Sequence, residues 1–522
     1  MLETLGLTKN TTFYLITTGV SLILTSAFVK WYRMYTYFSR LGLPGPKPLP
    51  IIGNLHQVIK RGMPYNDLEM TRIYGKTFGY FEGTTPIVLT TDPKLLKSLL
   101  IKDFHVFTNR RVLAPVEPFD KFLSLIKDDD WKNVRAILST TFTSGKLKSM
   151  SKLMVESSNQ LMEHLSVFAE KDENFDGKQY FGGLSLDVIC SCCFGFSIDS
   201  IKEPDNEVIQ HLKKMFVGSN TADPRLLLLI LFPSLAIYLA QKGMLEVVPR
   251  KSLEFLKSLT FSIIERRKNK TEFREDFIQT MIENEQTLDT EETNSHVEEN
   301  QWNPKDIKYL RKKLSHAEIF SQAIMFLLAG FETTLNTLNF IAYNLATNQD
   351  VQQKLIDEIE RVLENHNEKI TYESVAEMKY MNMVIDETLR IFPAAIRLDR
   401  VASEDFEFEG MKIKKGQLVV VPLWALHYNK DIFPDPERFD PERFSEENKK
   451  LRDSITYLPF GNGPRTCLAT RFVQIEMKIA LANILTKFRF ETCDKTPEKL
   501  EIDSSGFGRS KLPIILKIKK RL

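Results

Sequence analysis

The sequence predicts a mainly α-helical fold with small β-sheets, and three patterns lead to that prediction. The longest is Ser315–Thr347, which is apolar on most sides of a helix about 50 Å long at 1.5 Å per residue. A second apolar helical pattern follows the loop Phe460–Ala469, and Ile87–Thr91 is a short strand pattern that ends in turn residues. A helix that is apolar all round is expected to cross the middle of a globular body. The other elements should therefore pack around Ser315–Thr347.

Length and composition indicate one large globular domain behind an N-terminal leader. The chain has 522 residues, of which 43% are hydrophobic and 26% charged, as in a soluble protein with a large core. No linker rich in Gly, Ser or Pro divides residues 51–522, so we expect a single domain there. The net charge of +2 argues against nucleic acid as the main partner.

The cysteines predict a reducing environment rather than a disulfide framework. They are few, odd in number and mostly placed on apolar runs. The cluster at 190–193 has no histidine or second cysteine pair beside it, so small buried thiols are favoured over a metal site. The five are Cys190, Cys192, Cys193, Cys467 and Cys493.

The N-terminus predicts a single membrane anchor. Asn10–Val29 is uncharged for 20 residues, which is enough for one bilayer-spanning helix. Basic residues follow this stretch, so the body is expected in the cytosol. A cleaved secretory signal is the alternative, but no clean small-x-small cleavage site follows the apolar run. We therefore expect an anchor at 1–30, a basic and proline-rich joint at 31–50, and the globular domain at 51–522.

Several stretches in the first half of the chain predict local structure. Ile87–Thr91 is expected to be a strand that turns into a helix, and Trp131 and Arg135 share one helix face at i and i+4. Leu226–Leu239 is apolar but too short and interrupted to span a bilayer, so it either touches a membrane surface or forms a buried core helix. Glu283–Asp306 is polar and acidic, and we expect a surface loop.

The centre of the long helix, Ala329–Thr334, has features of a ligand-facing segment. Gly330 costs a helix about 1 kcal/mol relative to alanine, but it lets a flat ligand lie against the backbone. The hydroxyl of Thr333 can bond to a backbone carbonyl and open a small groove. Glu332 and Thr333 together can form a proton route to something bound beside the helix. The alternative for this segment alone is a core helix with a solvent-facing glutamate.

The region after the long helix contains charged pairs and short strands. Glu387 and Arg390 share a helix face at i and i+3, a pattern that by itself usually forms a surface salt bridge. Arg400 follows on an extended stretch. Phe406–Glu409 and Leu418–Pro422 are expected to pair as a hairpin.

The loop Phe460–Ala469 is the most informative stretch. Its two glycines and its proline predict a tight irregular loop that delivers Cys467 to the start of a helix, whose N-terminus stabilises a thiolate. Arg465 adds a fixed positive charge, and Phe460 can cover the sulfur. This arrangement suits the axial ligand of a heme iron better than a merely buried thiol. A dinucleotide-binding loop is disfavoured because Thr466 occupies the third glycine position.

Taken in order along the chain, these segments resemble the four signature segments of the cytochrome P450 family. Those segments are Ala329–Thr334, Glu387–Arg390, Pro441–Phe444 and the Cys467 loop. Three further stretches are similar to the microsomal clan of vertebrate drug- and steroid-oxidising enzymes. They are Phe107–Arg111, Thr141–Leu147 and Ala395–Arg400. The resemblance implies the cytochrome P450 fold, with the heme between the long central helix and the cysteine loop. One departure is Ala469, where the family usually has glycine.

The resemblance also implies roles for individual residues. Cys467 would bind the iron of heme b, with Phe460 beside the sulfur. The heme propionates would be bound by Arg110, Trp131, Arg135, Arg400 and Arg465. Glu332 and Thr333 would guide protons to dioxygen, and Glu387, Arg390 and Arg443 would form a buried structural triad. The segments that contact substrate would include Leu328, Ala329, Ala394, Ala395, Ile396 and Phe507.

The function implied by the resemblance is that of a heme-thiolate monooxygenase. Such an enzyme inserts one atom of O2 into an apolar organic substrate, here a xenobiotic, a steroid or a lipid. The chain has no flavin or nicotinamide fingerprint, so a membrane-bound NADPH–cytochrome reductase is the expected electron donor, with cytochrome b5 as a second candidate. We expect the endoplasmic reticulum membrane as its location, with a cytosolic catalytic domain. Lys519 and Lys520 stand where a dilysine retrieval signal would.

Two other functions stay open at this point. A heme-thiolate isomerase or dehydratase, such as thromboxane synthase, rearranges peroxides without a reductase. A non-catalytic heme protein could bind a lipid or a gas as a carrier or sensor. Glu332 with Thr333 argues against both, because neither function needs protons delivered to oxygen.

Overall fold

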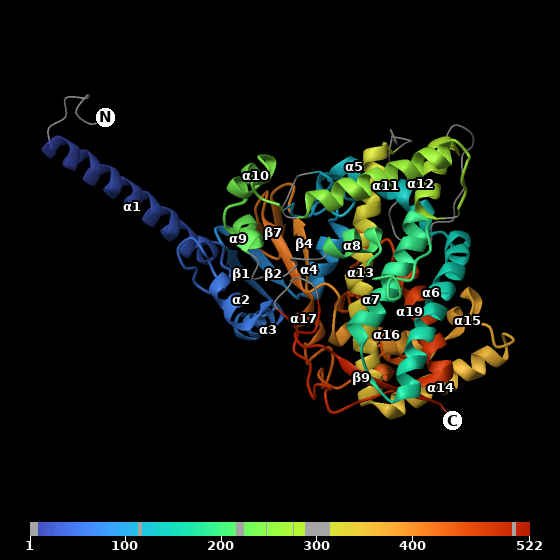
Figure 1. Cartoon of the computed structure of the whole chain (residues 1–522). Helices are drawn as coiled ribbons and strands as arrows, with labels where there is room; N and C mark the ends of the chain where they lie inside the picture. The colour runs from blue at the N-terminus through green and yellow to red at the C-terminus, as the bar shows by residue number, and fades with distance from the viewer. Residues whose placement is uncertain are drawn as a thin grey trace.

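The computed structural model has a helical body arranged around one long central helix, with a second long helix projecting from one side (Figure 1). The central helix is α13 (His316–Thr347) and the projecting helix is α1 (Lys9–Arg40). The structure describes residues 9–112, 117–215, 224–246, 248–274, 276–287, 314–503 and 508–521.

The two long helices differ in what surrounds them. Both are long and apolar enough to cross a membrane, but the apolar window of α1 is 0% buried and that of α13 is 67% buried. The base of α1 is attached to the joint, since Trp31 Nε1 donates to the carbonyl of Pro48 at 3.1 Å. Phe38, near the end of α1, packs on Phe81 with ring centroids 5.2 Å apart. These two contacts therefore fix the base of the projecting helix to the joint and to the body.

The helix α13 begins and ends where the sequence predicts. Ser315 Oγ accepts from the backbone N–H of Glu318 at 3.3 Å, and Glu318 Oε2 accepts from the backbone N–H of Ser315 at 2.8 Å. The remaining helices pack around α13 or cover the sheets. They are α2 (Leu55–Arg61), α3 (Met63–Tyr74), α4 (Pro93–Lys97), α5 (Asp128–Ser139), α6 (Ser144–Lys171), α7 (Gly177–Ile189), α8 (Glu207–Lys214), α9 (Pro224–Leu231), α10 (Pro233–Gln241), α11 (Arg250–Lys268), α12 (Phe277–Thr287), α14 (Gln349–Glu364), α15 (Tyr372–Glu377), α16 (Lys379–Ile391), α17 (Leu423–His427), α18 (Glu446–Lys449) and α19 (Thr470–Lys487).

The strands form three small sheets. The largest has the order β1-β2-β7-β4, in which β2 and β7 are parallel and the other neighbours antiparallel. A three-stranded sheet has the order β3-β9-β8, and β5 pairs with β6 as a hairpin. The strands are β1 (Thr77–Glu82), β2 (Thr85–Thr90), β3 (Asn174–Asp176), β4 (Arg397–Val401), β5 (Phe406–Phe408), β6 (Met411–Ile413), β7 (Leu418–Pro422), β8 (Phe488–Glu491) and β9 (Ile515–Lys520).

The predicted hairpin of Phe406–Glu409 with Leu418–Pro422 is wrong. The chain turns at Glu409 and Gly410, which have φ angles of 47° and 84°, so Phe406–Phe408 pairs with the next strand, β6. The strand β7 is buried along its whole length because it lies between β2 and β4. Its continuous apolar sequence fits that central position.

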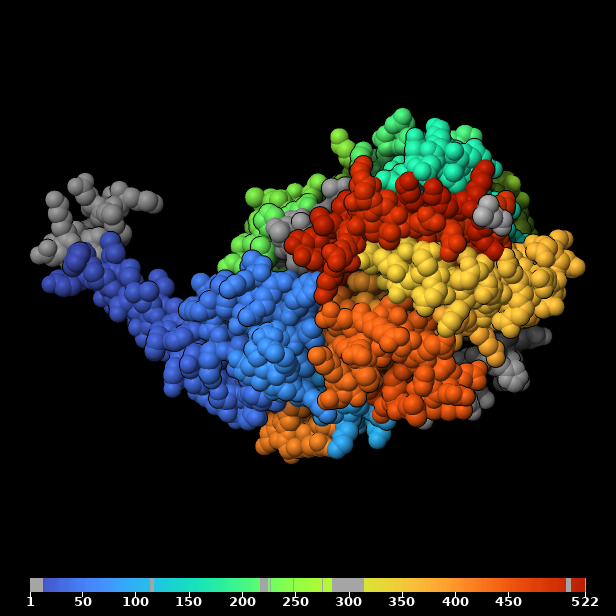
Figure 2. Space-filling model, turned by 90° about the horizontal axis from the view of Figure 1, so that it is seen from below, coloured from blue at the N-terminus to red at the C-terminus, as the bar shows by residue number. Residues whose placement is uncertain are grey.

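A side chain of α13 packs directly against the start of α7. An added Cβ on Gly177 would lie 2.1 Å from Asn339 Oδ1, so glycine leaves space for the Asn339 side chain. The C-terminal segment, red in Figure 2, lies against the yellow surface that contains α14. Gln352 of α14 donates to the carbonyl of Phe490 at 2.9 Å, which fixes that contact.

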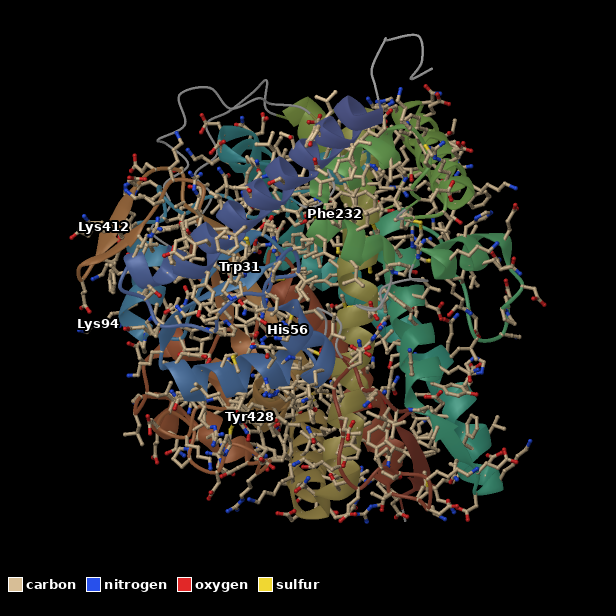
Figure 3. The ribbon with its side chains drawn as sticks, turned by 90° about the vertical axis from the view of Figure 1, so that its left-hand side faces the viewer. Trp31, His56, Lys94, Phe232, Lys412 and Tyr428 are labelled. Atoms are coloured by element: carbon tan, nitrogen blue, oxygen red, sulfur yellow. The ribbon has the colours of Figure 1, made fainter. Side chains whose placement is uncertain are left out.

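The apolar stretch at 226–239 forms the two short helices α9 and α10. It is not a buried core helix, because Phe232 is 46% exposed and Tyr238 is 54% exposed, although Ala236 is buried. Phe232 lies on the side of the molecule from which α1 projects, the same side as Trp31 (Figure 3). The exposed apolar side chains of this stretch therefore share a face with the projecting helix.

Candidate functional site

A cavity of about 360 Å³ lies between α13 and the loop that precedes α19. Its wall is mostly apolar, with a few arginines and hydroxyl groups. The residues of α13 that line it include Met325, Phe326, Ala329, Gly330, Thr333 and Thr334, and those of the loop include Phe460, Arg465, Thr466, Cys467, Leu468 and Ala469. A cavity of this size and character is suited to a large apolar ligand.

The loop holds Cys467 at the cavity wall through its glycines. Gly461 and Gly463 have φ angles of 76° and 70°, a region that favours glycine. Gly463 also lies so close to η2 (Ser98–Lys102) that an added Cβ would be 1.8 Å from the carbonyl oxygen of Leu100. The backbone N–H of Cys467 donates to the carbonyl of Phe460 at 2.8 Å, which closes the loop. The sulfur is thereby placed just before α19.

The other cysteines are in different environments. Cys190, Cys192 and Cys193 are buried, and burial raises the pKa of each thiol well above its usual value, so they stay neutral. Among the described residues, no group of three or more His, Cys, Asp or Glu side chains could hold a metal ion.

Arg465 is fully engaged inside the wall of the cavity. Its Nε donates to the carbonyl of Thr108 at 3.0 Å, Nη1 to Leu123 at 3.0 Å and Nη2 to Ile126 at 2.9 Å. The guanidinium carbon also lies 4.1 Å from the centroid of the Trp131 ring. The side chain is 3% exposed, its hydrogen-bond partners are neutral, and no carboxylate of the described residues forms an ion pair with it.

Three further arginines surround the same region. Arg110 Nη2 donates to the carbonyl of Arg465 at 3.1 Å, and Arg135 Nη1 donates to the carbonyl of Thr466 at 2.8 Å. Arg400 Nη1 donates to the carbonyl of the preceding residue at 2.8 Å, and its Nε is buried without a hydrogen-bond partner. Arg110, Arg135 and Arg465 line the cavity, whereas Arg400 does not line it but is close enough to lower the pKa of Arg465. We call these four the cavity arginines.

Burial lowers the pKa of every cavity arginine. The pKa falls to about 10 for Arg135, to about 9 for Arg400 and to about 8 for Arg465, and it also falls for Arg110. Mutual repulsion adds to burial, since Arg110, Arg400 and Arg135 all lower the pKa of Arg465. The charges of Asp399 and Asp128 offset this only partly. These four cations have neutral contacts, Arg400 and Arg465 are fully buried, and the Arg400 Nε has no hydrogen-bond partner among the described residues. They fit a ligand that carries carboxylates, as heme b does.

The centre of α13 presents hydroxyl groups to the cavity. Thr333 Oγ1 donates to the carbonyl of Ala329 at 2.6 Å, and Thr337 Oγ1 donates to the carbonyl of Thr333 at 2.8 Å. Thr334 Oγ1 is buried without a hydrogen-bond partner. An added Cβ on Gly330 would approach Ile189 Cδ1 to 3.2 Å, so the glycine also permits close packing against α7. Hydrogen bonding of this kind weakens the regular helix and leaves room beside it.

Glu332 occupies a different position from its neighbour. It is not among the residues that line the cavity, whereas Gly330 and Thr333 are. Its Oε1 lies 3.3 Å from Nη1 of Arg509, near the C-terminus of the chain. The carboxylate is therefore held at the flank of α13 and does not point freely into solvent.

Glu387, Arg390 and Arg443 form a buried network. Arg390 Nε and Nη2 donate to Glu387 at 2.7 and 2.9 Å, and both side chains are 0% exposed. Arg443 Nε lies 3.3 Å from Glu387 Oε1. Arg390 also donates to the carbonyls of His427 at 3.1 Å and Pro436 at 2.8 Å. This network joins α16 to the proline-rich stretch that precedes the cysteine loop.

The predicted substrate-contacting residues are divided by the structure. Ala329, Ala394 and Ala395 line the cavity. Leu328 and Ile396 are not among its lining residues, and Ile396 is 0% exposed. Phe507 lies outside the described residues.

Sequence reasoning missed two buried groups near the site. His427 is buried and its pKa falls to about 3, because burial and Arg390 disfavour the imidazolium; its neutral Nε2 accepts from the backbone N–H of Leu458 at 3.1 Å. Glu476 of α19 lines the cavity, and burial raises its pKa well above the usual value, so it is protonated. The available signal for Glu476 was one acid inside an otherwise apolar helical run.

Comparisons with known proteins were consistent across the chain. A family model described as Cytochrome P450 matches residues 43–518. Cytochrome P450 3A11 of Mus musculus is 42% identical over 494 residues, which cover 94% of this chain and 93% of the relative. Cytochrome P450 3A5 of Homo sapiens is 40% identical and Cytochrome P450 3A29 of Sus scrofa is 38% identical, each over 505 residues that cover 96% of both chains.

Proposed function

The chain belongs to the cytochrome P450 family, and we propose that Cys467 is the thiolate ligand of its heme iron. The protein is a heme-thiolate monooxygenase that uses heme b as cofactor and O2 as co-substrate. The family and the mainly α-helical fold predicted from the sequence are thereby confirmed. The heme supplies oxygen activation, and the thiolate favours cleavage of the O–O bond.

The observation that supports Cys467 most strongly is its position at the cavity wall. It lies in a loop whose positive φ angles favour glycine, beside arginines whose positive charge is only partly compensated. Positive charge stabilises a thiolate over a thiol. Cys193 lines the same cavity, but its thiol is kept neutral by burial and its Sγ lies 3.9 Å from the carbonyl of Ala323.

We further propose that the cavity arginines bind the carboxylates of the heme. Burial and mutual repulsion make their charges costly, and a carboxylate contact would relieve that cost. Trp131 would support them, because its ring already stacks under the Arg465 guanidinium at 4.1 Å. Phe460 would shield the sulfur from water, since it lines the cavity beside Cys467.

We propose that two residues of α13 deliver protons to the cavity. Thr333 Oγ1 donates to the carbonyl of Ala329, and turning away from that carbonyl would direct its proton into the cavity. Glu332 would resupply the proton to Thr333 from the solvent side, because it is 15% exposed and directly adjacent. The apolar wall excludes water from the rest of the site.

The network of Glu387, Arg390 and Arg443 would brace the cysteine loop without touching the reacting atoms. Its path runs from Arg390 to the carbonyl of His427, and from His427 Nε2 to the N–H of Leu458, just before the loop. The apolar residues Ala329, Ala394 and Ala395 would contact substrate, and Leu328, Ile396 and Phe507 stay predictions for that role. The lining suits apolar xenobiotics, steroids or lipids.

The membrane arrangement and the electron donors are also proposals. The exposed apolar helix α1 supports an anchor at 1–30, with the joint at 31–50 and the catalytic domain at 51–522. The exposed Phe232, on the side from which α1 projects, would lie at the bilayer surface (Figure 3). We propose the endoplasmic reticulum membrane as the location, NADPH–cytochrome reductase as the electron donor and cytochrome b5 as an additional donor.

The ligand assignment is tested by Cys467→Ser. A serine cannot supply a thiolate, so the reduced carbon monoxide complex should lose the red-shifted Soret band that thiolate ligation produces. Cys193→Ser is the matched control, because it changes a cysteine of the same cavity and should leave that band in place. An unchanged band in Cys467→Ser would refute the assignment.

A further inference from the structure

Two short segments that pair through their backbones, Ile502–Asp503 and residues 508–510, precede β9 and lie beside the cavity. The backbone N–H of Asp503 donates to the carbonyl of Arg509 at 3.0 Å, and Ile502 forms a bridge with Ser510. We call Ile502, Asp503 and residues 508–510 the hairpin base. Its position is defined by backbone hydrogen bonds, so the Arg509 side chain starts from a fixed point.

The hairpin base is pressed against the cavity wall. The N–H of Gly508 donates to the carbonyl of Ala394 at 3.1 Å. An added Cβ on Gly508 would lie 2.3 Å from the carbonyl oxygen of Pro393, so the two backbones approach as closely as glycine permits. Ala394 lines the cavity, so only this residue separates the hairpin base from the cavity.

Arg509 lies between two carboxylates that belong to different parts of the fold. Its Nε is in close contact with Asp503 Oδ2 of the hairpin base, and its Nη1 lies 3.3 Å from Glu332 Oε1 of α13. All three side chains are between 15% and 19% exposed, so they are partly shielded from water. The contact to Asp503 is the tighter of the two, and the contact to Glu332 is at the long end for an ion pair with a hydrogen bond.

We propose that Arg509 is a positioning residue that sets where the Glu332 carboxylate lies. The inference rests on the proposed proton role of Glu332. Asp503 anchors the guanidinium, and the guanidinium holds Glu332 at the flank of α13 between solvent and Thr333. Because the contact to Glu332 is the looser one, the carboxylate can leave Arg509, take up a proton from solvent and pass it to Thr333 while Arg509 stays in place.

The geometry of α13 explains why such a residue is needed. Consecutive helical residues point about 100° apart, and of this pair Thr333 lines the cavity whereas Glu332 does not. Glutamate has several rotatable bonds, and the helix backbone alone does not fix its carboxylate. A catalytic acid that is not held in one place loses much of its effect.

The test is a double-mutant cycle between Glu332→Gln and Arg509→Gln in the full-length, heme-loaded protein. NADPH-cytochrome reductase supplies the electrons, testosterone is the probe substrate, and the ratio of product formed to NADPH consumed is measured. Each single variant should lower that ratio by about threefold or more, since a general acid contributes a large factor to the rate. The double variant should be no worse than Glu332→Gln alone, because Arg509 acts through Glu332.

Two further variants separate position from fold. Arg509→Lys keeps the charge and should restore part of the ratio. Lys511→Gln is the matched control, since it removes a nearby cation. The ion pair of Lys511 with Glu501 is exposed, with 62% and 63% of the two side chains accessible. It should leave the ratio unchanged.

Infrared spectroscopy provides a readout that needs no turnover. Subtraction of the Glu332→Gln spectrum isolates the carboxylate stretching band of Glu332. That band should shift in Arg509→Gln and stay in place in Lys511→Gln. An unshifted band in Arg509→Gln would overturn the inference, even if the ratio fell.

The kinetic outcomes distinguish this inference from the proposed function. If Glu332→Gln lowers the ratio and Arg509→Gln does not, the positioning role fails and the proton role stands. If Arg509→Gln lowers the ratio equally in the presence and absence of Glu332, Arg509 acts elsewhere and the inference also fails. If Glu332→Gln has no effect, the proton role itself is refuted, and the positioning role fails with it.

Discussion

Two sets of buried arginines in this protein differ in what compensates their charge. Arg390 and Arg397 are each held by carboxylates, and we call them the structural arginines. Arg390 donates twice to Glu387, and Arg397 contacts Asp67 Oδ1 and Glu82 Oε1 at 2.5 Å. The cavity arginines contact backbone carbonyls and one another instead.

The difference appears in the direction of the pKa shifts. Burial acts to lower the pKa of Arg397, but Asp67 and Glu82 outweigh it and raise the pKa above its usual value. For Arg465 burial and the neighbouring arginines act together, and the pKa falls to about 8. A buried cation that the protein has compensated belongs to the architecture, whereas one that it has not compensated indicates a site for an anion.

The largest expected effect comes from breaking a compensated pair. Glu387→Gln leaves Arg390 buried without its carboxylate, which should reduce the free energy of unfolding by about 3–5 kcal/mol. Denaturant unfolding followed by circular dichroism measures this loss. Glu437→Gln is the control, because its pair with Lys499 is 73% and 80% exposed and should contribute about 0–1 kcal/mol. Equal losses in the two variants would remove the basis for calling Arg390 structural.

Asp187 is the opposite case to the structural arginines, because it is a buried carboxyl group with which no cation of the described residues forms an ion pair. Asp187 is 2% exposed, and burial raises its pKa to about 7, although the N–H of Ser200 donates to it at 3.0 Å and Lys213 opposes the shift. Because the folded-state pKa is raised, the stability from the protonated form is fully present below about pH 4 and is lost as the pH rises through about 7.

Asp187→Asn should remove this pH dependence. The free energy of unfolding of the variant relative to the wild type should rise by about 2–3 kcal/mol between pH 5 and pH 8, because the variant stays neutral while Asp187 of the wild type ionises. Unfolding curves at the two pH values test this. The same difference at both pH values would mean that Asp187 does not titrate between them.

The sequence predicted those features that depend on local pattern. The bounds of α13, the strand-to-helix turn at Asp92 and the glycine loop before Cys467 follow from periodicity, capping and turn residues close in the chain. The pairing of strands that are distant in the chain could not be predicted from local patterns. Leu418–Pro422 has the composition of any buried strand, and its partners β2 and β4 are fixed by tertiary packing.

The candidate site divides in the same way. The family resemblance named Cys467 and the cavity arginines, but residue type alone could not separate Arg397 from Arg400, which are three positions apart on β4. Their side chains differ because Asp67 and Glu82, far away in the sequence, reach only one of them. The contact of Arg509 with Glu332 spans 177 residues, and no local pattern reports it.

The smallest expected effect on stability, and the sharpest test of the comparison, comes from Arg400→Gln beside Arg397→Gln. Burial and repulsion from Arg110 lower the pKa of Arg400 to about 9, so at pH 7 it is still charged and its charge opposes folding. Removing this charge should leave the denaturant concentration at which the helices unfold unchanged or slightly higher. Heme transfer to apomyoglobin should become about tenfold faster, as expected for one lost charge-assisted hydrogen bond.

Arg397→Gln should behave in the opposite way. It leaves Asp67 and Glu82 buried without their cation, so the helices should unfold at lower denaturant concentration. Heme transfer should change only as far as the protein unfolds, since the Arg397 guanidinium is already paired with those carboxylates. If Arg400→Gln instead destabilised the helices and left heme transfer unchanged, Arg400 would belong with the structural arginines, and an uncompensated buried cation would no longer identify the anion site of this protein.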